Sequence, residues 1–186
     1  MRYRLASEAS TVTVRTGTEG LFARMAHRLE LVARPAEGWG EREGEVVRGA
    51  LRVRSSDLHV TGVLRGDRVD AQVLAAADVS AIDARVAGEL FGGVVTFEIE
   101  VDARVGAAGG TASVSSARGK ASSTVRLTVV EEGESLRVTA EARLSLRALG
   151  AGPVSGPLGA FRVADEVDVT FRGHFVPEAA GAALSC

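Results

Sequence analysis

The stretch SLRVTAEARLSLRALG, residues 135–150, alternates apolar and polar side chains with almost no interruption. Successive side chains of a β-strand point to opposite faces of the sheet, so this alternation predicts a strand with one buried and one wet face. The stretch is longer than a typical strand, which favours a tall barrel. Its apolar face carries Leu136, Val138, Ala140, Ala142, Leu144 and Leu146.

The same alternation recurs from one end of the chain to the other. It is clear in VVTFEIEVDARV (94–105) and in DEVDVTFRGHF (165–175). Together with the weaker alternations, these segments predict about eight strands or a few more. The weaker segments are STVTVRTG (10–17), AHRLELVAR (26–34), GALRVRSSDLHVTG (49–62), DRVDAQVLAA (67–76) and STVRLTVVEEG (123–133).

One segment has helical spacing, and two others have the composition of loops. In DVSAIDARVAGELFGG (78–93), Ile82, Val86 and Leu90 recur every fourth residue, Asp78 or Ser80 can cap the start, and Gly92 follows the end. PAEGWGEREGE (35–45) and RVGAAGGTASVSSARGK (104–120) are rich in glycine and small polar residues. We expect both to be mobile surface loops.

Strands that each have one apolar face must pack against a second sheet or close on themselves. Closure also removes exposed sheet edges. The strand length, and the lack of the cysteine and tryptophan marks of an immunoglobulin-like sandwich, favour a barrel. We therefore predict an all-β fold, an extended antiparallel barrel with one short helix, as a single domain over residues 1–186. Its core would span about residues 3–176, followed by a flexible C-terminal tail.

Composition and charge exclude several classes of function. The net charge is −2 and the charges are interleaved, so we expect no nucleic-acid partner. Cys186 is the single cysteine, so no intrachain disulfide can form. No stretch approaches the roughly 20 apolar residues of a membrane span. The start of the chain lacks the apolar centre of a secretory signal, so we expect cytoplasmic residence, or periplasmic residence if a leader has been removed.

The residues that could support catalysis are few. No GxSxG serine setting and no His-x-His or paired-cysteine pattern occurs in the sequence, so we expect neither an enzyme nor a metal site. His59 and His174 fall on the polar faces of their strands. His27 shares the face of Leu29 and Leu31, which is compatible with a hydrogen-bonded core histidine or with a ligand-binding one. It is the best candidate for a polar anchor.

The predicted barrel interior is built from small residues. Only 4% of the chain is aromatic, and the inward faces are mainly Val, Ala, Leu and Gly. A barrel of this size holds either a filled core or one ligand when its side chains are small. Because the interior has few charges, an elongated apolar ligand is favoured over a polar one. The residues alone leave the filled core as an equal alternative.

Both ends of the chain resemble a known family. LGAGPVSGPLGAFRVADEVDVTFRGHF (149–175) combines a Gly- and Pro-containing loop with Arg-Val-x-Asp-Glu-Val and a closing strand, and it resembles the C-terminal signature of the YceI-like family. The matching positions are Gly150, Pro153, Leu158, Gly159, Ala160, Val163, Asp165, Glu166 and Val167. The N-terminal stretch 3–34 is similar too, with a Tyr start and a His, His27, that opens the second strand.

The resemblance implies a bacterial, lipocalin-like barrel that binds a polyisoprenoid or similar amphiphilic lipid. The cargo would be an isoprenoid, a quinone tail or a fatty acyl chain, with no other cofactor. Family members often dimerise, so a homodimer is compatible with it. By face assignment we expect the ligand to contact His27, Leu29, Leu31, Phe97, Ile99, Leu144, Leu146, Val169 and Phe171. The alternatives are a filled barrel that acts as a structural or protein-interaction module, and an enzyme that uses His27.

Overall fold

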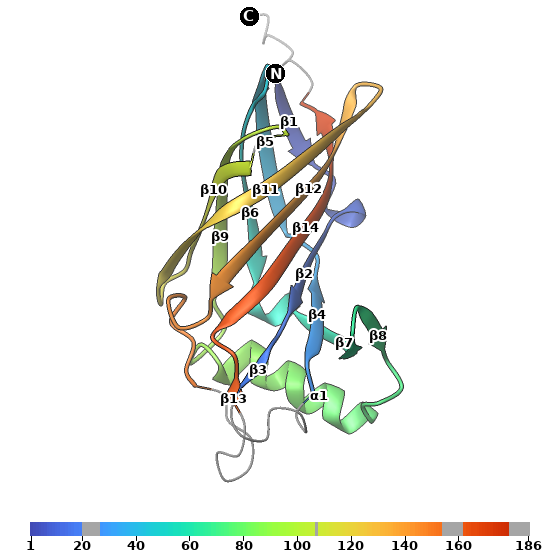
Figure 1. Ribbon diagram of the computed structural model, residues 1–186, viewed down its shortest axis with the longest axis vertical. Coiled ribbons are helices and arrows are strands. Elements are labelled where there is room, and N and C mark those ends of the chain that lie inside the picture. The colour runs from blue at the N-terminus through green and yellow to red at the C-terminus, as the bar shows by residue number, and fades with distance from the viewer. Residues whose placement is uncertain (20–26, 107, 154–161, 179–186) are drawn as a thin grey trace, which may run out of the picture.

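The computed structural model describes residues 1–19, 27–106, 108–153 and 162–178. The predicted tail with Cys186, and the part of the Gly/Pro stretch at 154–161, lie outside these residues. Strands run along the long axis of an elongated barrel, and one helix, α1, crosses its lower end (Figure 1). The all-β, antiparallel, lipocalin-like fold with a short helix is thereby confirmed.

An eight-stranded antiparallel ring forms the barrel, closed by the pairing of β1 with β14. In ring order the strands are β1 (Arg2–Leu5), β5 (Glu37–Glu43), β6 (Val46–Arg54), β9 (Thr96–Arg104), β10 (Ala108–Ser115), β11 (Lys120–Glu132), β12 (Ser135–Ser145) and β14 (Glu166–Pro177). The predicted apolar faces point inward: Val138 and Phe175, for example, are 7% and 8% exposed. Closure therefore buries one face of every strand in the ring.

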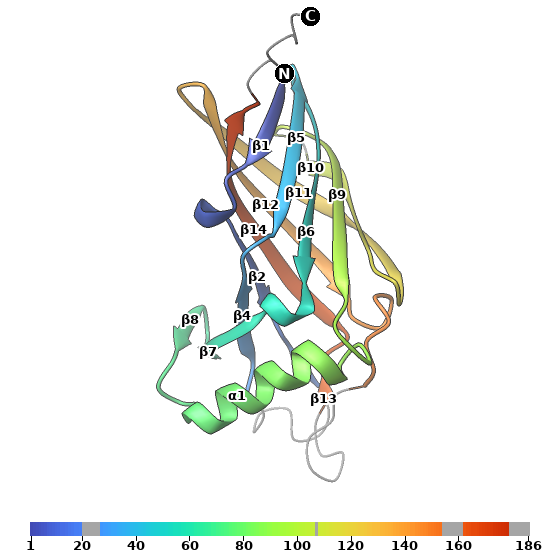
Figure 2. The ribbon, with the colours of Figure 1, turned by 180° about the vertical axis from the view of Figure 1, so that it is seen from behind.

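Three parts of the wall break midway and continue as separate strands. After β1 comes a short turn, η1 (Ser7–Ala9), and then β2 (Thr11–Arg15), which pairs with β14 further along the same edge. The other continuations are β4 (Leu29–Ala33), which precedes β5, and β7 (His59–Arg65), which follows β6 after the turn η3 (Ser55–Asp57). β7 pairs with β4 and β8 (Arg68–Asp70) rather than with β9, so the lower wall turns away from β9 (Figure 2).

A helical segment lies where the lower wall turns away. It consists of α1 (Ala76–Ala84) and a π-helical turn, η4 (Arg85–Glu89), in which the N–H of Leu90 donates to the carbonyl of Arg85 at 2.9 Å. The carboxylate of Asp78 accepts a hydrogen bond from the N–H of Ala75 at 3.2 Å, and Gly92 has φ +64°. The helix begins at Ala76, two residues before the predicted start, so Asp78 acts from the third helical position and not as the N-cap, whereas Gly92 follows the end as predicted. A separate two-stranded sheet joins β3 (Thr18–Glu19) to β13 (Arg162–Val163).

The two predicted glycine-rich loops are wrong, because they form β5 and β10. Glycines hold inward positions there, which hides the alternation in the sequence. A Cβ on Gly38 would lie 3.0 Å from Leu5 Cδ2, and one on Gly40 would lie 3.5 Å from the ring of Phe175. In β10, a Cβ on Gly110 would collide with Ala103. The strands therefore need glycine where neighbouring walls or rings approach closely.

The predicted strand over 67–76 is also largely wrong. Only Arg68–Asp70 is extended. The carboxylate of Asp70 then accepts a hydrogen bond from the N–H of Gln72 at 3.1 Å, and the chain turns toward α1. Local capping by an aspartate side chain competes here with continued strand pairing.

The upper half of the barrel is filled. The rings of Phe171 and Phe175 meet edge to face with centroids 6.1 Å apart. A Cβ on Gly173, between them on β14, would collide with the Phe171 ring, so the ring occupies the space above this glycine. Around the two rings pack buried side chains from the other strands, among them Tyr3, Leu5, Leu51, Val125, Leu127 and Leu136. The aromatic rings thus fill the centre of a region otherwise lined mainly by aliphatic residues.

Candidate ligand cavity

The lower half of the barrel is hollow. A cavity of about 680 Å³ lies between the lower strands and the helical segment. Its lining is almost wholly apolar; among the described residues the polar contributors are Thr16, His27 and Arg85. A volume of this size and character is typical of a small-molecule site.

Every lining residue predicted from the sequence except Phe171 lies on this cavity. They come from four strands and from the segments beside them. The predicted residues found on the cavity are His27, Leu29, Leu31, Phe97, Ile99, Leu144, Leu146 and Val169. Phe171 instead lines a separate small cavity of about 50 Å³ in the upper half. Face assignment therefore gave the correct side of each strand, but for Phe171 it did not give the level along the barrel.

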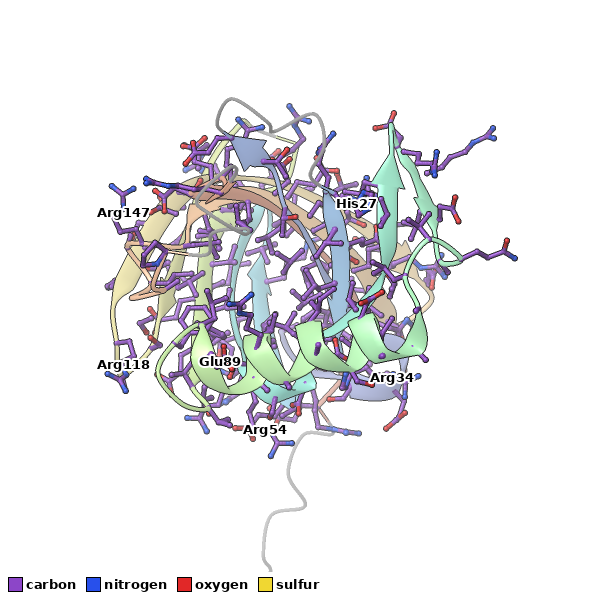
Figure 3. All side chains as sticks on the ribbon, turned by 90° about the horizontal axis from the view of Figure 1, so that it is seen from below. His27, Arg34, Arg54, Glu89, Arg118 and Arg147 are labelled. Atoms are coloured by element: carbon purple, nitrogen blue, oxygen red, sulfur yellow. The ribbon has the colours of Figure 1, made fainter. Side chains whose placement is uncertain are left out.

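His27 lies at the rim and not in a core. The residue is exposed, although it precedes β4 and shares the face of Leu29. Seen from below, it lies across the barrel opening from α1 (Figure 3). The interpretation of His27 as a buried core histidine is therefore wrong, because the inward face of β4 opens here onto the cavity.

The helical segment supplies the wall that the sequence analysis missed. Ile82, Val86 and Leu90 line the cavity. Their four-residue spacing was visible in the sequence, but spacing alone cannot show whether an apolar helix stripe meets side chains or empty space. Phe91, which also lines the cavity, packs edge to face on Phe97 with ring centroids 5.1 Å apart. An aromatic pair thus forms part of the cavity wall.

Some of the inward-facing side chains around the cavity are only half-buried. Ile99 and Val169 point into the barrel, yet both keep more exposure than their neighbours Phe97 and Val167, which are 7% and 3% exposed. An inward side chain stays exposed only where nothing packs against it. These two side chains therefore face open space, and an apolar ligand there would remove their surface from water.

A buried serine ties the helical segment to the wall. Ser55 is 0% exposed; its hydroxyl donates to the carbonyl of Ala87 in η4 at 3.3 Å and accepts the N–H of Val95 at 3.1 Å. The N–H of Ser55 also donates to the carbonyl of Val95 at 2.9 Å. η4 is thereby held over the cavity at the point where β6 gives way to β7.

A polar recess of about 280 Å³ adjoins the cavity, and Leu146 and Val163 line both. Asp165 lies in this recess and accepts the backbone N–H of Arg147 and the hydroxyl of Ser145, each at 2.8 Å. These hydrogen bonds, the one from Arg147 first, hold the pKa of the Asp165 carboxyl below its usual range. Asp165 thereby joins the end of β12 to the start of β14.

Each of the two other histidines lies beside a carboxylate on the outer surface. His59 Nδ1 lies 3.1 Å from Asp83 Oδ2, and His174 Nδ1 lies 3.8 Å from a carboxylate oxygen of Glu132. Within the described ranges no cluster of three or more His, Cys, Asp and Glu side chains is placed to hold a metal ion. The helices of that part of the chain include none long and apolar enough to cross a membrane.

These features define an antiparallel barrel of lipocalin-like architecture with an apolar cavity at one end. In overall fold the chain is similar to BcnA of Burkholderia cenocepacia, known from a crystal structure, with a TM-score of 0.58. The two chains are 15% identical over 91% of this chain and 98% of BcnA, a likeness of fold alone. No protein-family profile matches the sequence, and a search of curated proteins finds no match.

Proposed function

We propose that the protein binds one amphiphilic lipid in the lower cavity and does so without catalysing a reaction. The cargo is an isoprenoid, a quinone tail or a fatty acyl chain, which the protein carries, stores or senses. One observation carries this proposal: a cavity of about 680 Å³ whose lining is almost entirely aliphatic and aromatic.

The free energy of such binding depends on how many methylenes of the lipid tail are buried. Burial of each methylene contributes about 0.8 kcal/mol, so a dozen contribute about 10 kcal/mol. Association costs an estimated 4–15 kcal/mol in lost freedom, so before any headgroup contact is counted the balance runs from about 6 kcal/mol favourable to about 5 kcal/mol unfavourable. A polar ligand would lose its hydrogen bonds to water against this lining and gain few in return.

The sequence motifs support the same proposal. The Arg-Val-x-Asp-Glu-Val signature and the N-terminal motif resemble the YceI-like family, and we propose that the chain is a YceI-like protein. Arg162 and Val163 of this signature form β13, Asp165 joins β12 to β14, and Glu166 begins β14. The filled-barrel alternative describes the upper half of this barrel but not the lower half.

Substitutions inside the cavity test the proposal directly. Leu144→Glu and Phe97→Glu each place a carboxylate in the apolar lining, where its desolvation opposes a lipid tail. Glu98→Gln is the matched control, since Glu98 is on the outer face of the same strand as Phe97 and pairs with Arg52 at 3.2 Å. Native mass spectrometry after incubation with a fatty acid and with a polyprenyl lipid measures retention.

We expect the wild type and Glu98→Gln to retain lipid equally and the two cavity variants to lose it. Circular dichroism establishes that each variant is folded before retention is compared. If the cavity variants are folded and retain as much lipid as the control, the cavity is not the binding site. An enzyme that uses His27 is tested separately by His27→Ala, which under this proposal leaves lipid retention in place.

A further inference from the structure

The change from the hollow lower half to the filled upper half of the barrel occurs within one step between inward-facing residues. Along β14 the inward residues Val167 and Val169 line the large cavity, while Phe171 and Phe175 line the small one. On β6, Val53 lines the large cavity and Leu51 the small one. The change of cavity occurs between neighbouring inward positions on both strands.

Two side chains occupy this level. Ile99 lines both cavities, so it lies on the boundary between them. Phe171 is the first inward residue of β14 beyond the large cavity, and its neighbours across the sheet are the smaller Ala140 on β12 and Val12 on β2. Phe171 therefore supplies most of the bulk on its side of the barrel, and we name Phe171 and Ile99 the septum.

The septum is held in place from above. The Phe171 ring occupies the space over Gly173 and packs edge to face on Phe175. The ring of Phe175 in turn lies against Gly40, where a Cβ would be 3.5 Å away. Because Phe171 is 8% exposed, little free space remains around its ring. A ligand tail that reaches the septum meets a packed aromatic layer.

Two of the three polar lining residues, Thr16 and His27, lie at the other end. Thr16 follows β2 and His27 precedes β4, and His27 lies at the rim of the opening (Figure 3). A bound amphiphile would therefore place its headgroup at the rim and its tail toward the septum. At about 30 Å³ per non-hydrogen atom, the cavity takes roughly 20 such atoms.

We propose that Phe171 and Ile99 close the cavity at its inner end and set the maximum length of the lipid tail it takes. This inference rests on the proposed lipid-binding function. It assigns a preference for a single chain with roughly 20 non-hydrogen atoms, such as a short isoprenoid or an ordinary fatty acid, over a polyisoprenoid that would need the full length of the barrel.

A series of saturated fatty acids from about 10 to about 24 carbons tests the length limit, with affinity measured by competition in native mass spectrometry. In the wild type, affinity should rise about fourfold per added methylene and then level off when the tail reaches the septum. Phe171→Ala opens a path to the small cavity above, so its plateau should move several carbons longer, with at least about a tenfold gain for the longest acids.

Two further variants keep the test decisive if Phe171→Ala folds poorly. Val169→Phe fills space on the cavity side of the septum, creates no void, and should move the plateau to shorter chains. Val129→Ala is the control: it removes bulk from the lining of the small cavity on β11 and leaves Phe171, Ile99 and Phe175 in place, so its plateau should equal that of the wild type.

The possible results distinguish failure of the length limit from failure of lipid binding itself. If no acid of any length binds the wild type, the lipid-binding proposal fails, and the length limit fails with it. If acids bind but Val169→Phe and folded Phe171→Ala keep the wild-type plateau, lipid binding stands and the septum does not set the length. Opposite shifts in these two variants, with no shift in Val129→Ala, establish the septum.

Discussion

The hydroxyl of Ser10 accepts a hydrogen bond from the backbone N–H of His174 at 3.1 Å, and so bridges the break between β1 and β2 on the edge of β14. Ser10 is 1% exposed, and its hydroxyl also donates to the carbonyl of Ala6 at 2.7 Å. At the break between β6 and β7, the hydroxyl of Ser55 likewise accepts a hydrogen bond from a backbone N–H, that of Val95. Two of the three wall breaks are thus closed by a buried serine.

Removal of these hydroxyls should separate stability from binding. Ser10→Ala and Ser55→Ala each leave a backbone N–H without its partner, and each should lower the free energy of unfolding by about 1–3 kcal/mol in urea denaturation. Only Ser55 holds η4 over the cavity, so only Ser55→Ala should also weaken lipid retention. Equal lipid affinity in the two variants would show that η4 does not depend on Ser55.

The Asp165 carboxylate should make stability depend on pH in acid. Its pKa is lower in the folded chain, so its contribution is present above the unfolded value of about 4 and is lost as pH falls through the folded value. Between about pH 5 and pH 2 the wild type should therefore lose more stability than Asp165→Asn. Thermal unfolding across this range measures the difference.

A control for this titration is Asp67→Asn, which changes an exposed carboxylate in the turn between β7 and β8. It should keep the wild-type dependence on pH. If stability falls equally with pH in the wild type and in Asp165→Asn, the hydrogen bonds from Arg147 and Ser145 do not favour the charged carboxylate.

Gly173 and Phe171 should be energetically coupled, because the Phe171 ring fills the space over the glycine. Gly173→Ala forces the ring aside, whereas in Phe171→Leu a smaller side chain leaves room for the added methyl. The double variant should be more stable than the sum of the single losses predicts, by about 0.5–3 kcal/mol. Urea denaturation of the four proteins gives this coupling, and strict additivity would place the ring elsewhere.

His27→Ala should have small effects. The residue is exposed at the rim, so its loss should change the free energy of unfolding by less than about 0.5 kcal/mol. Lipid affinity should stay within about tenfold of the wild type, because the tail and not the rim supplies most of the buried apolar surface. Complete loss of binding would make His27 a principal anchor.

The alternation of side chains was sufficient to predict β9, β12 and β14, because long strands with one wet face carry the signal at every position. It failed where glycine holds inward positions, as at Gly38, Gly40 and Gly110, since a missing side chain leaves no apolar mark. These glycines are required by contacts with distant residues, which no local pattern records.

Most of the cavity lining could also be predicted, because the inward face of a strand follows from its alternation. The level of Phe171 could not, since it depends on where the barrel is filled by Phe175 and on where the lower wall turns away from β9. The helical residues Ile82 and Val86 were visible as a stripe, but their position over the opening depends on the buried hydrogen bonds of Ser55.

The most direct test of the central claim is native mass spectrometry of the full chain purified from its own host, followed by solvent extraction and lipid analysis. We expect one lipid per protein chain, with a single apolar tail, released on denaturation. After delipidation, added fatty acid should restore the same stoichiometry in the wild type but not in Leu144→Glu. A protein mass without adduct, unchanged after incubation with fatty acids and with polyprenyl lipids, would contradict it.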